Sequence, residues 1–297
     1  MIISGFTFVK NAMVFGYPIV ESINSLLPLC DELIVAVGKS DDNTTEVINN
    51  IQNSKIKIIE TEWDPNLKKD GLIYSQQTNL ALQHCKGDWC IYLQADEVFH
   101  ENDQKMTFDK IEFANSNKEI DALLFKYLHF YGSYDYVGVG RQWYRREIRA
   151  FRNTGKVISW GDAQGFRKKT DKGIQLLTAL QTDIRVYHYG WVRPPKAQYK
   201  KIRNSHNYYK EHVNLSLNEL EELDFGYSSA YELTPFQGNH PTYMKEKIER
   251  DKIWTVNFDP KKLKPKPFLV KLCDNIEKKT GYRIGEFKDF KEVKIKS

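Results

Sequence analysis

Apolar and polar positions alternate along the first hundred residues in a way that predicts strands and helices in turn. Short runs of apolar, β-branched and aromatic residues at 2–9, 31–37, 55–60 and 90–93 are typical of buried strands. Between them, apolar residues recur at helical spacing over 17–27, from 44 to about 52, and over 70–86. This order predicts a doubly wound, mostly parallel α/β sheet flanked by helices.

The fourth of these strands lies in residues 87–97, which read GDWCIYLQADE. A strand that ends in carboxylates places them at the carboxyl edge of an α/β sheet, where such sheets bind ligands. A carboxylate at that edge can hold a divalent ion, and the ion can bridge the phosphates of a nucleotide. The pattern therefore makes Asp96 the centre of a predicted site.

The pattern changes after residue 100. Further strands are predicted at 122–131, 144–151 and 182–189, and helices at 194–213, 215–223 and 268–279. We therefore expect one sheet domain over residues 1–195, built from two halves, 1–100 and 101–195. Residues 196–297 are expected to form a helical, basic extension packed on that domain rather than a second core.

Composition is that of an ordinary globular domain, with 41% hydrophobic and 28% charged residues. No stretch approaches the roughly 18–20 consecutive apolar residues of a membrane span. The chain opens directly into a strand pattern without a secretory signal, so we expect a cytoplasmic protein. The four cysteines, Cys30, Cys85, Cys90 and Cys273, lack close-paired metal spacing, which is typical of structural thiols in a reducing compartment.

Charge is unevenly distributed. Residues 261–297 hold twelve Lys/Arg against five Asp/Glu, a net +7, so of the total +5 the first 260 residues carry −2. A basic tail of this kind can contact anionic lipid head groups, or it can be a solvated surface helix. Nucleic acid is not expected as a partner, because the positive charge is confined to the tail and no recognised module accompanies it.

Four motifs taken in order resemble the family 2 nucleotide-sugar glycosyltransferases of the GT-A fold. They are Phe6-Thr7-Phe8-Val9-Lys10-Asn11 after the first strand, Ser40-Asp41-Asp42-Asn43-Thr44 in an acidic loop, Asn79 upstream of Gly87-Asp88-Trp89, and Gln94-Ala95-Asp96-Glu97. The resemblance is good over the first hundred residues and weaker to about residue 195. It implies that residues 1–100 are the nucleotide-binding half and residues 101–195 the acceptor half of a GT-A glycosyltransferase domain. It implies an inverting transfer of sugar from a nucleotide-sugar donor to a glycan or lipid-linked acceptor, of the kind used for bacterial lipopolysaccharide or capsule.

The chain departs from the family pattern at three places. Val37 and Gly38 stand where an Asp often reads the nucleobase, Thr78 where a basic residue often precedes the Asn, and Gln94 in place of the first Asp of the metal motif. Asp96 retains the position credited with metal contact. His188, in Val186-Tyr187-His188-Tyr189-Gly190-Trp191, resembles a late histidine that supplements the metal, and its imidazole favours Mn²⁺ over Mg²⁺.

The resemblance assigns the remaining roles. Contacts to the nucleotide sugar are expected from Thr7, Phe8, Asn11, Asp42, Gln76, Asn79, Gln94, Ala95, Asp96 and Arg193. We expect Asp162 to be the catalytic base, with Asp135 and Glu97 as competitors. Contacts to the acceptor are expected from the aromatic residues Trp160, Phe166 and Trp191.

Two other functions remain open from the sequence. A sugar-phosphate nucleotidyltransferase has the same scaffold, but no Gly-rich phosphate loop follows the first strand. A non-catalytic or metal-independent relative that binds nucleotide or glycan is suggested by Gln94, which adds no charge to the metal motif. The first hypothesis requires a divalent cation, Mn²⁺ or Mg²⁺, and metal-dependent release of nucleoside diphosphate separates it from the others.

Overall fold

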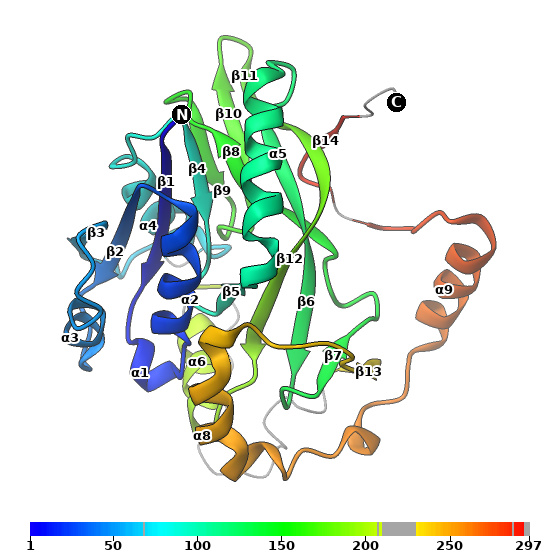
Figure 1. Ribbon diagram of the computed structural model, residues 1–297. Helices are drawn as coiled ribbons and strands as arrows, with labels where there is room; N and C mark the ends of the chain where they lie inside the picture. The colour runs from blue at the N-terminus through cyan, green and yellow to red at the C-terminus, as the bar shows by residue number, and fades with distance from the viewer. Residues whose placement is uncertain (68, 207, 210–229, 287, 294–297) are drawn as a thin grey trace.

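The computed structural model describes residues 1–67, 69–206, 208–209, 230–286 and 288–293 (Figure 1). Its centre is a mixed sheet in which eight strands follow one another in the order β13-β7-β6-β8-β4-β1-β2-β3. Helices cover both faces of this sheet. The mixed α/β class predicted from the sequence is therefore confirmed.

The parallel half of the sheet contains the four strands that the apolar runs predicted. They are β1 (Ile3–Val9), β2 (Glu32–Gly38), β3 (Ile56–Thr61) and β4 (Trp89–Tyr92). Strand β1 lies between β2 and β4, and all of these pairings are parallel. Their carboxyl ends therefore meet at one edge, where the chain leaves β4 for Asp96.

Helices sandwich this half because the strands are apolar on both faces. Leu33, Val35 and Val37 of β2 pack in one core with α2 (Ile19–Leu26) and α5 (Gln104–Ser116). The alternate residues Ile34 and Ala36 pack in a second core with α4 (Leu72–Leu82). Two short helices, α1 (Ala12–Phe15) and α3 (Thr44–Asn49), follow β1 and β2.

The other half of the sheet is mostly antiparallel. Strand β8 (Arg146–Arg152) joins β4 to β6 (Ala122–Tyr131), and the long β12 (Thr178–Trp191) pairs with β6 in parallel and with β5 (Glu97–Phe99) antiparallel. Strands β7 (Tyr136–Gly138) and β13 (Leu233–Pro235) extend one side, and β14 (Lys291–Glu292) pairs with β12. These pairings bring residues from β6 and β12 beside the end of β4.

A small antiparallel sheet lies next to α4. It consists of β9 (Val157–Trp160), β10 (Gly165–Thr170) and β11 (Gly173–Leu176). The later helices are α6 (Pro195–His206), α8 (Lys245–Thr255) and α9 (Phe268–Thr280), with short 3₁₀ turns at Leu27–Leu29, Glu101–Asp103, Thr242–Met244 and Pro260–Lys262. No helix in the described ranges is long and apolar enough to cross a membrane.

Several features were not predicted from the pattern. Helices α5 and α8 and the three-stranded sheet of β9, β10 and β11 were missed, and β12 extends beyond the predicted strand 182–189 at both ends. The helix predicted at 215–223 lies outside the described residues. The division into a domain of residues 1–195 and an extension of 196–297 stays a prediction.

Candidate active site

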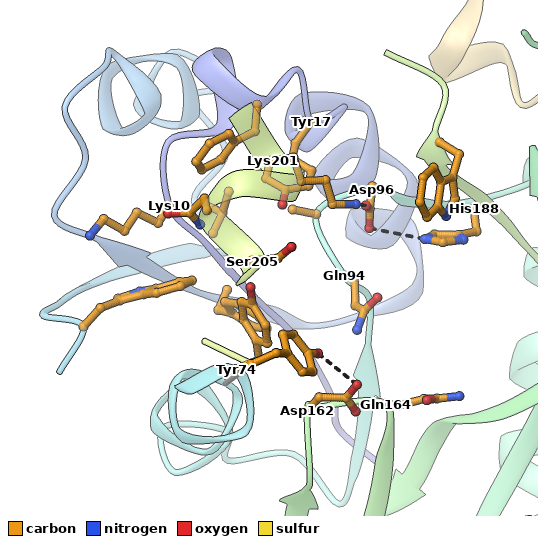
Figure 2. A pocket seen from close by; sticks show the side chains of 18 of the residues that line it. Lys10, Tyr17, Tyr74, Gln94, Asp96, Asp162, Gln164, His188, Lys201 and Ser205 are labelled. Carbon is orange, nitrogen blue, oxygen red and sulfur yellow. Dashed lines mark hydrogen bonds and ion pairs between the residues drawn. The ribbon is translucent and has the colours of Figure 1, made fainter. Parts of the chain in front are cut away.

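A cavity of about 440 Å³ opens at the carboxyl ends of β1 and β4 (Figure 2). Seven predicted site residues line it: Phe8, Gln94, Ala95, Asp96, Asp162, His188 and Trp191. They come from segments far apart in the chain, and the parallel strands and β12 bring them together. Asp96 is 5% exposed and still reaches the cavity wall, as the strand-end argument predicted.

Asp96 is surrounded by nitrogen-bearing side chains. Its Oδ2 accepts hydrogen bonds from Lys201 Nζ at 3.1 Å and Arg193 Nη2 at 3.2 Å, and its Oδ1 lies 3.7 Å from His188 Nε2. Figure 2 shows Lys201 and His188 on either side of the carboxylate. Burial alone would raise the pKa of Asp96, but the charges of Lys201 and Arg193 hold it well below its usual range. The carboxylate is therefore ionised at neutral pH.

His188 is held in one tautomer by a second histidine. His129 Nε2 lies 2.7 Å from the backbone carbonyl of Tyr144, which only accepts, so this nitrogen carries the proton. His129 Nδ1 is then an acceptor, and His188 Nδ1 donates to it at 2.8 Å. Burial lowers the pKa of His188 to about 4 and that of His129 to about 3, so both rings are neutral at pH 7. His188 Nε2 therefore presents a lone pair to the cavity and to Asp96.

A lone pair and a carboxylate oxygen that face each other make a suitable pair of ligands for a divalent cation. In the described part of the chain, no group of three or more His, Cys, Asp or Glu side chains gathers into a metal site. Among the described residues the candidate ligands are therefore Asp96 and His188, and a bound diphosphate would have to complete the coordination shell. Gly190 leaves the space open, since a Cβ at this position would collide with His188 Nε2 and lie 3.3 Å from Asp96 Oδ2.

Lys201 is a second cation at the same carboxylate. It stands on α6 and also donates to the carbonyl of Gly190 at 3.2 Å. Burial, reinforced by Arg193, lowers the pKa of Lys201 to about 8, and the charge of Asp96 opposes this shift. Arg193 itself is fully buried and also donates to the carbonyl of Phe15 at 2.8 Å. A diphosphate entering the cavity would meet a charged ammonium at this wall.

An aromatic niche forms the other end of the cavity. The ring of Phe8 stacks on Tyr74 with centroids 6.2 Å apart, and the ring of Trp63 lies 6.1 Å from it. Lys10 Nζ lies 5.5 Å from the centre of the Trp63 ring. All four side chains line the cavity. A flat, apolar group such as a nucleobase fits this surface.

Asp162 lies on the turn between β9 and β10. Gly161 and Ala163, on either side of it, have positive φ, which turns the Asp162 side chain towards the cavity. Its Oδ2 accepts a hydrogen bond from the hydroxyl of Tyr209 at 3.1 Å. Figure 2 shows Gln94 between Asp162 and Asp96 in the view.

The two competing carboxylates are placed elsewhere. Glu97 is fully buried, where Arg149 donates to both its oxygens at 2.9 and 3.0 Å and Tyr127 donates at 2.7 Å. Asp135 is exposed in a turn, receives a hydrogen bond from Ser133, and does not line the cavity. Of the three, Asp162 is the one that lines the cavity, and its role as catalytic base stays a prediction.

Several residues predicted to touch the donor instead hold the framework. Asn11 exchanges hydrogen bonds with Asp41, Asp42 accepts from the backbone of Val14 at 2.9 Å, and Asn79 bonds the backbone of Ser159 in both directions. Thr7 is buried in β1 and Gln76 is exposed on α4. None of these five lines the cavity, and their expected nucleotide contacts stay predictions.

The acceptor residues have three different environments. Trp191 lines the cavity. Trp160 is partly exposed at the end of β9 and lies under the guanidinium of Arg167, 4.6 Å from the ring centre. Phe166 has no exposed surface, because it packs against Phe6, Tyr92 and Phe151 in the core. The interpretation of Phe166 as a surface for sugar is corrected accordingly.

The sequence argument missed Lys201, His129, Tyr74 and Trp63. Nothing in the sequence distinguishes Lys201 from its neighbour Lys200, because the choice depends on which face of α6 turns inward. His129 meets His188 through the register of β6 on β12, in which the two residues are direct partners. That register joins positions 59 residues apart and has no local signal.

The sequence of this chain matches a known protein family. The model of the family described as glycosyl transferase family 2 matches residues 16–175, more than half of the chain. The chain belongs to glycosyl transferase family 2. The family predicted from its motifs is therefore confirmed. No curated protein sequence matches this chain.

Solved structures of glycosyltransferases also match, at low identity. S. aureus TarS (residues 1–349) in complex with UDP is 21% identical over 44% of this chain and 36% of its own, with a TM-score of 0.33. Mannosyltransferase PcManGT from Pyrobaculum calidifontis, in complex with GDP-Man and Mn²⁺, is 14% identical over 88% of this chain and 71% of its own, with a TM-score of 0.40.

A third match is glucosyl-3-phosphoglycerate synthase from Mycobacterium tuberculosis in complex with Mn²⁺, UDP and phosphoglyceric acid. It is 20% identical over 43% of each chain, with a TM-score of 0.29. The match to TarS spans about a third of that protein's length.

Proposed function

We propose that this protein transfers a sugar, with inversion, from a nucleoside-diphosphate sugar to a hydroxyl of a glycan or lipid-linked saccharide. The observation that carries the proposal is the arrangement around Asp96. An ionised carboxylate, a neutral imidazole with its lone pair outward, and Lys201 meet at the wall of one cavity. This is the chemistry that a diphosphate and its cation require.

In this proposal the donor lies along the cavity from the aromatic niche to Asp96. The nucleobase would lie on Phe8, Trp63 and Tyr74, and the diphosphate would point to Lys201. Asp96 Oδ1 and His188 Nε2 would hold a divalent cation, Mn²⁺ or Mg²⁺, with diphosphate oxygens as the other ligands. When bound, such a cation neutralises charge on the leaving diphosphate.

Asp162 has the catalytic role in this proposal. The acceptor oxygen forms a bond to the anomeric carbon from the face opposite the diphosphate, and its proton passes to Asp162. The bond between the anomeric carbon and the diphosphate oxygen breaks, and the nucleoside diphosphate leaves with the electron pair. Lys201 stabilises that charge, and Tyr209 keeps the Asp162 carboxylate oriented through its hydrogen bond.

Metal-independent transfer is the second candidate, and one observation favours it. Lys201 and Arg193 already place two positive charges on Asp96 Oδ2, within a cavity that a diphosphate would enter. In this version, Lys201 would neutralise the leaving group without a metal ion. Activity in the presence of a chelator distinguishes the two versions.

The acceptor and the pathway are finer parts of the proposal. Trp191 offers a ring face at the cavity, which suits a sugar. A cytoplasmic enzyme at the inner face of a membrane, building a surface polysaccharide, is consistent with this site and with the basic tail. Transfer assays with purified lipid-linked saccharides test this part separately.

The test uses the full chain with a panel of UDP-, GDP-, CMP- and dTDP-sugars. We expect one donor to raise the melting temperature and to release nucleoside diphosphate, more strongly with Mn²⁺ than with a chelator. Asp162→Asn should lower turnover about 10²- to 10⁴-fold and keep donor binding, and Asp135→Asn, outside the cavity, should change neither. If no donor binds or turns over under any condition, the proposal is wrong.

A further inference from the structure

Helix α9 lies at the edge of the molecule, away from the central sheet (Figure 1). An ordinary surface helix turns its apolar stripe towards the core, and α9 does not. Its acidic residues face the body of the protein. Asp274 accepts from Arg141 Nε at 2.8 Å and from Lys266 Nζ at 2.8 Å, and Glu277 accepts from Arg141 Nη2 at 2.8 Å. These ion pairs attach α9 to the rest of the protein through its polar side.

The apolar side of α9 faces outward. Phe268 is 78% exposed, Leu269 71% and Leu272 48%, and no residue of the helix is fully buried. At 100° per residue these three lie within one sector, on the opposite side of the helix from Asp274 and Glu277. A patch of large apolar side chains held outward in this way is typical of a surface that binds something else.

Exposed lysines accompany this patch along the chain. Lys271, Lys278 and Lys279 are on α9 itself, and Lys261, Lys262 and Lys264 are on the segment that leads into it. The acidic residues of the helix are paired with Arg141, Arg145 and Lys266, so they do not offset this charge at the outer face. The outward face of α9 is therefore apolar, and the charge that accompanies it is positive.

We propose that the outer face of α9 lies on an anionic membrane surface, with Phe268, Leu269 and Leu272 inserted at the head-group boundary. Aromatic and aliphatic side chains accompanied by lysines are the combination that holds an amphipathic helix in the plane of such an interface. The lysines gain from the negative surface potential of anionic lipids. This proposal does not depend on the proposed function, because it concerns binding and not catalysis.

A second copy of the chain is the other occupant to consider. In a two-fold contact the same patch would meet itself, so the accompanying lysines of both copies would face one another. Anionic lipid head groups instead complement every one of these charges. Charge complementarity therefore favours the membrane.

The test is co-sedimentation of the full chain with phosphatidylcholine vesicles, with and without phosphatidylglycerol. We expect binding that requires phosphatidylglycerol and weakens as salt is added. The triple variant Phe268→Ser, Leu269→Ser, Leu272→Ser should lower the partition coefficient at least about tenfold. Phe113→Ser, which removes a 43% exposed ring from α5, is the control for loss of a surface aromatic side chain elsewhere and should bind like the wild type.

A second variant separates charge from apolar contact. Lys271→Gln with Lys278→Gln should reduce binding about fivefold for each lysine lost, and circular dichroism should show an unchanged fold for all variants. Three results overturn the proposal: no binding to phosphatidylglycerol vesicles at low salt, full binding by the serine triple variant, or self-association of the wild type in solution that the triple variant loses. The last result assigns the patch to a second copy.

Discussion

The Nδ1 atoms of His129 and His188 lie 2.8 Å apart, and this contact decides which nitrogen of His188 faces the cavity. The Tyr144 carbonyl fixes the proton on His129 Nε2, so His129 Nδ1 must accept. His188 Nδ1 therefore donates, and His188 Nε2 is left without a proton at the cavity wall. A metal-binding histidine usually donates its second N–H to a carboxylate or carbonyl. Here a second histidine accepts it.

Replacing His129 tests this relationship. His129→Phe keeps the ring packed among Tyr127, Trp143 and Tyr144 but removes the acceptor for His188 Nδ1–H. We expect Mn²⁺ affinity in the presence of the donor's nucleoside diphosphate to fall about 10- to 100-fold. Histidine ¹⁵N chemical shifts, which report the tautomer, should change at His188. The exposed His84 serves as a control, and His84→Gln should leave both measurements unchanged.

Gly190 offers a steric test of the same site. A Cβ at this position collides with His188 Nε2 and crowds Asp96, so Gly190→Ala should block the space between the two ligands. We expect donor turnover to fall at least about tenfold, with a smaller effect on binding of a nucleoside that lacks phosphates, because the niche around Phe8 is remote from the added methyl group. Equal loss of both would show that the methyl group disturbs the whole cavity.

Lys201 predicts a pH dependence. Its pKa is lowered to about 8, so the ammonium is charged below that pH and neutral above it. The kcat/KM for the donor, which reports the free enzyme, should therefore fall as pH rises through about 8. Lys201→Arg, which stays charged, should move this fall in kcat/KM to higher pH. Lys201→Met should remove the pH dependence together with most of the activity. If kcat/KM still falls at about pH 8 in both variants, a group other than Lys201 causes the fall.

Glu97 and Asp162 should respond to substitution in opposite ways. Glu97→Gln leaves Arg149 buried without its counter-charge, and we expect a loss of about 3 kcal/mol or more in the free energy of unfolding, measured with urea. Asp162→Asn should cost little stability and lower kcat about 10²- to 10⁴-fold. As a control, Asp109→Asn, in an exposed pair with Lys105, should change stability by less than about 1 kcal/mol.

Site residues could be predicted where their position depends only on neighbouring residues in the sequence. Asp96 follows a short apolar strand directly, so its place at the sheet edge depends on four or five neighbouring residues. Asn79 shows where this reasoning stops: its amide binds Ser159, on a strand of the small sheet that the pattern did not predict. Phe166 was misread for the same reason. Once β10 is a strand, Phe166 points into the core beside Phe151 and Tyr92.

Binding of Mn²⁺ to the wild type and to Asp96→Asn, measured by electron paramagnetic resonance with and without the nucleoside diphosphate of the preferred donor, tests the central claim most directly. Because the protein supplies two ligands, we predict weak binding of Mn²⁺ alone, at least about tenfold tighter binding with the nucleotide, and loss of this gain in Asp96→Asn. Equal affinity in the wild type and in Asp96→Asn would contradict the account.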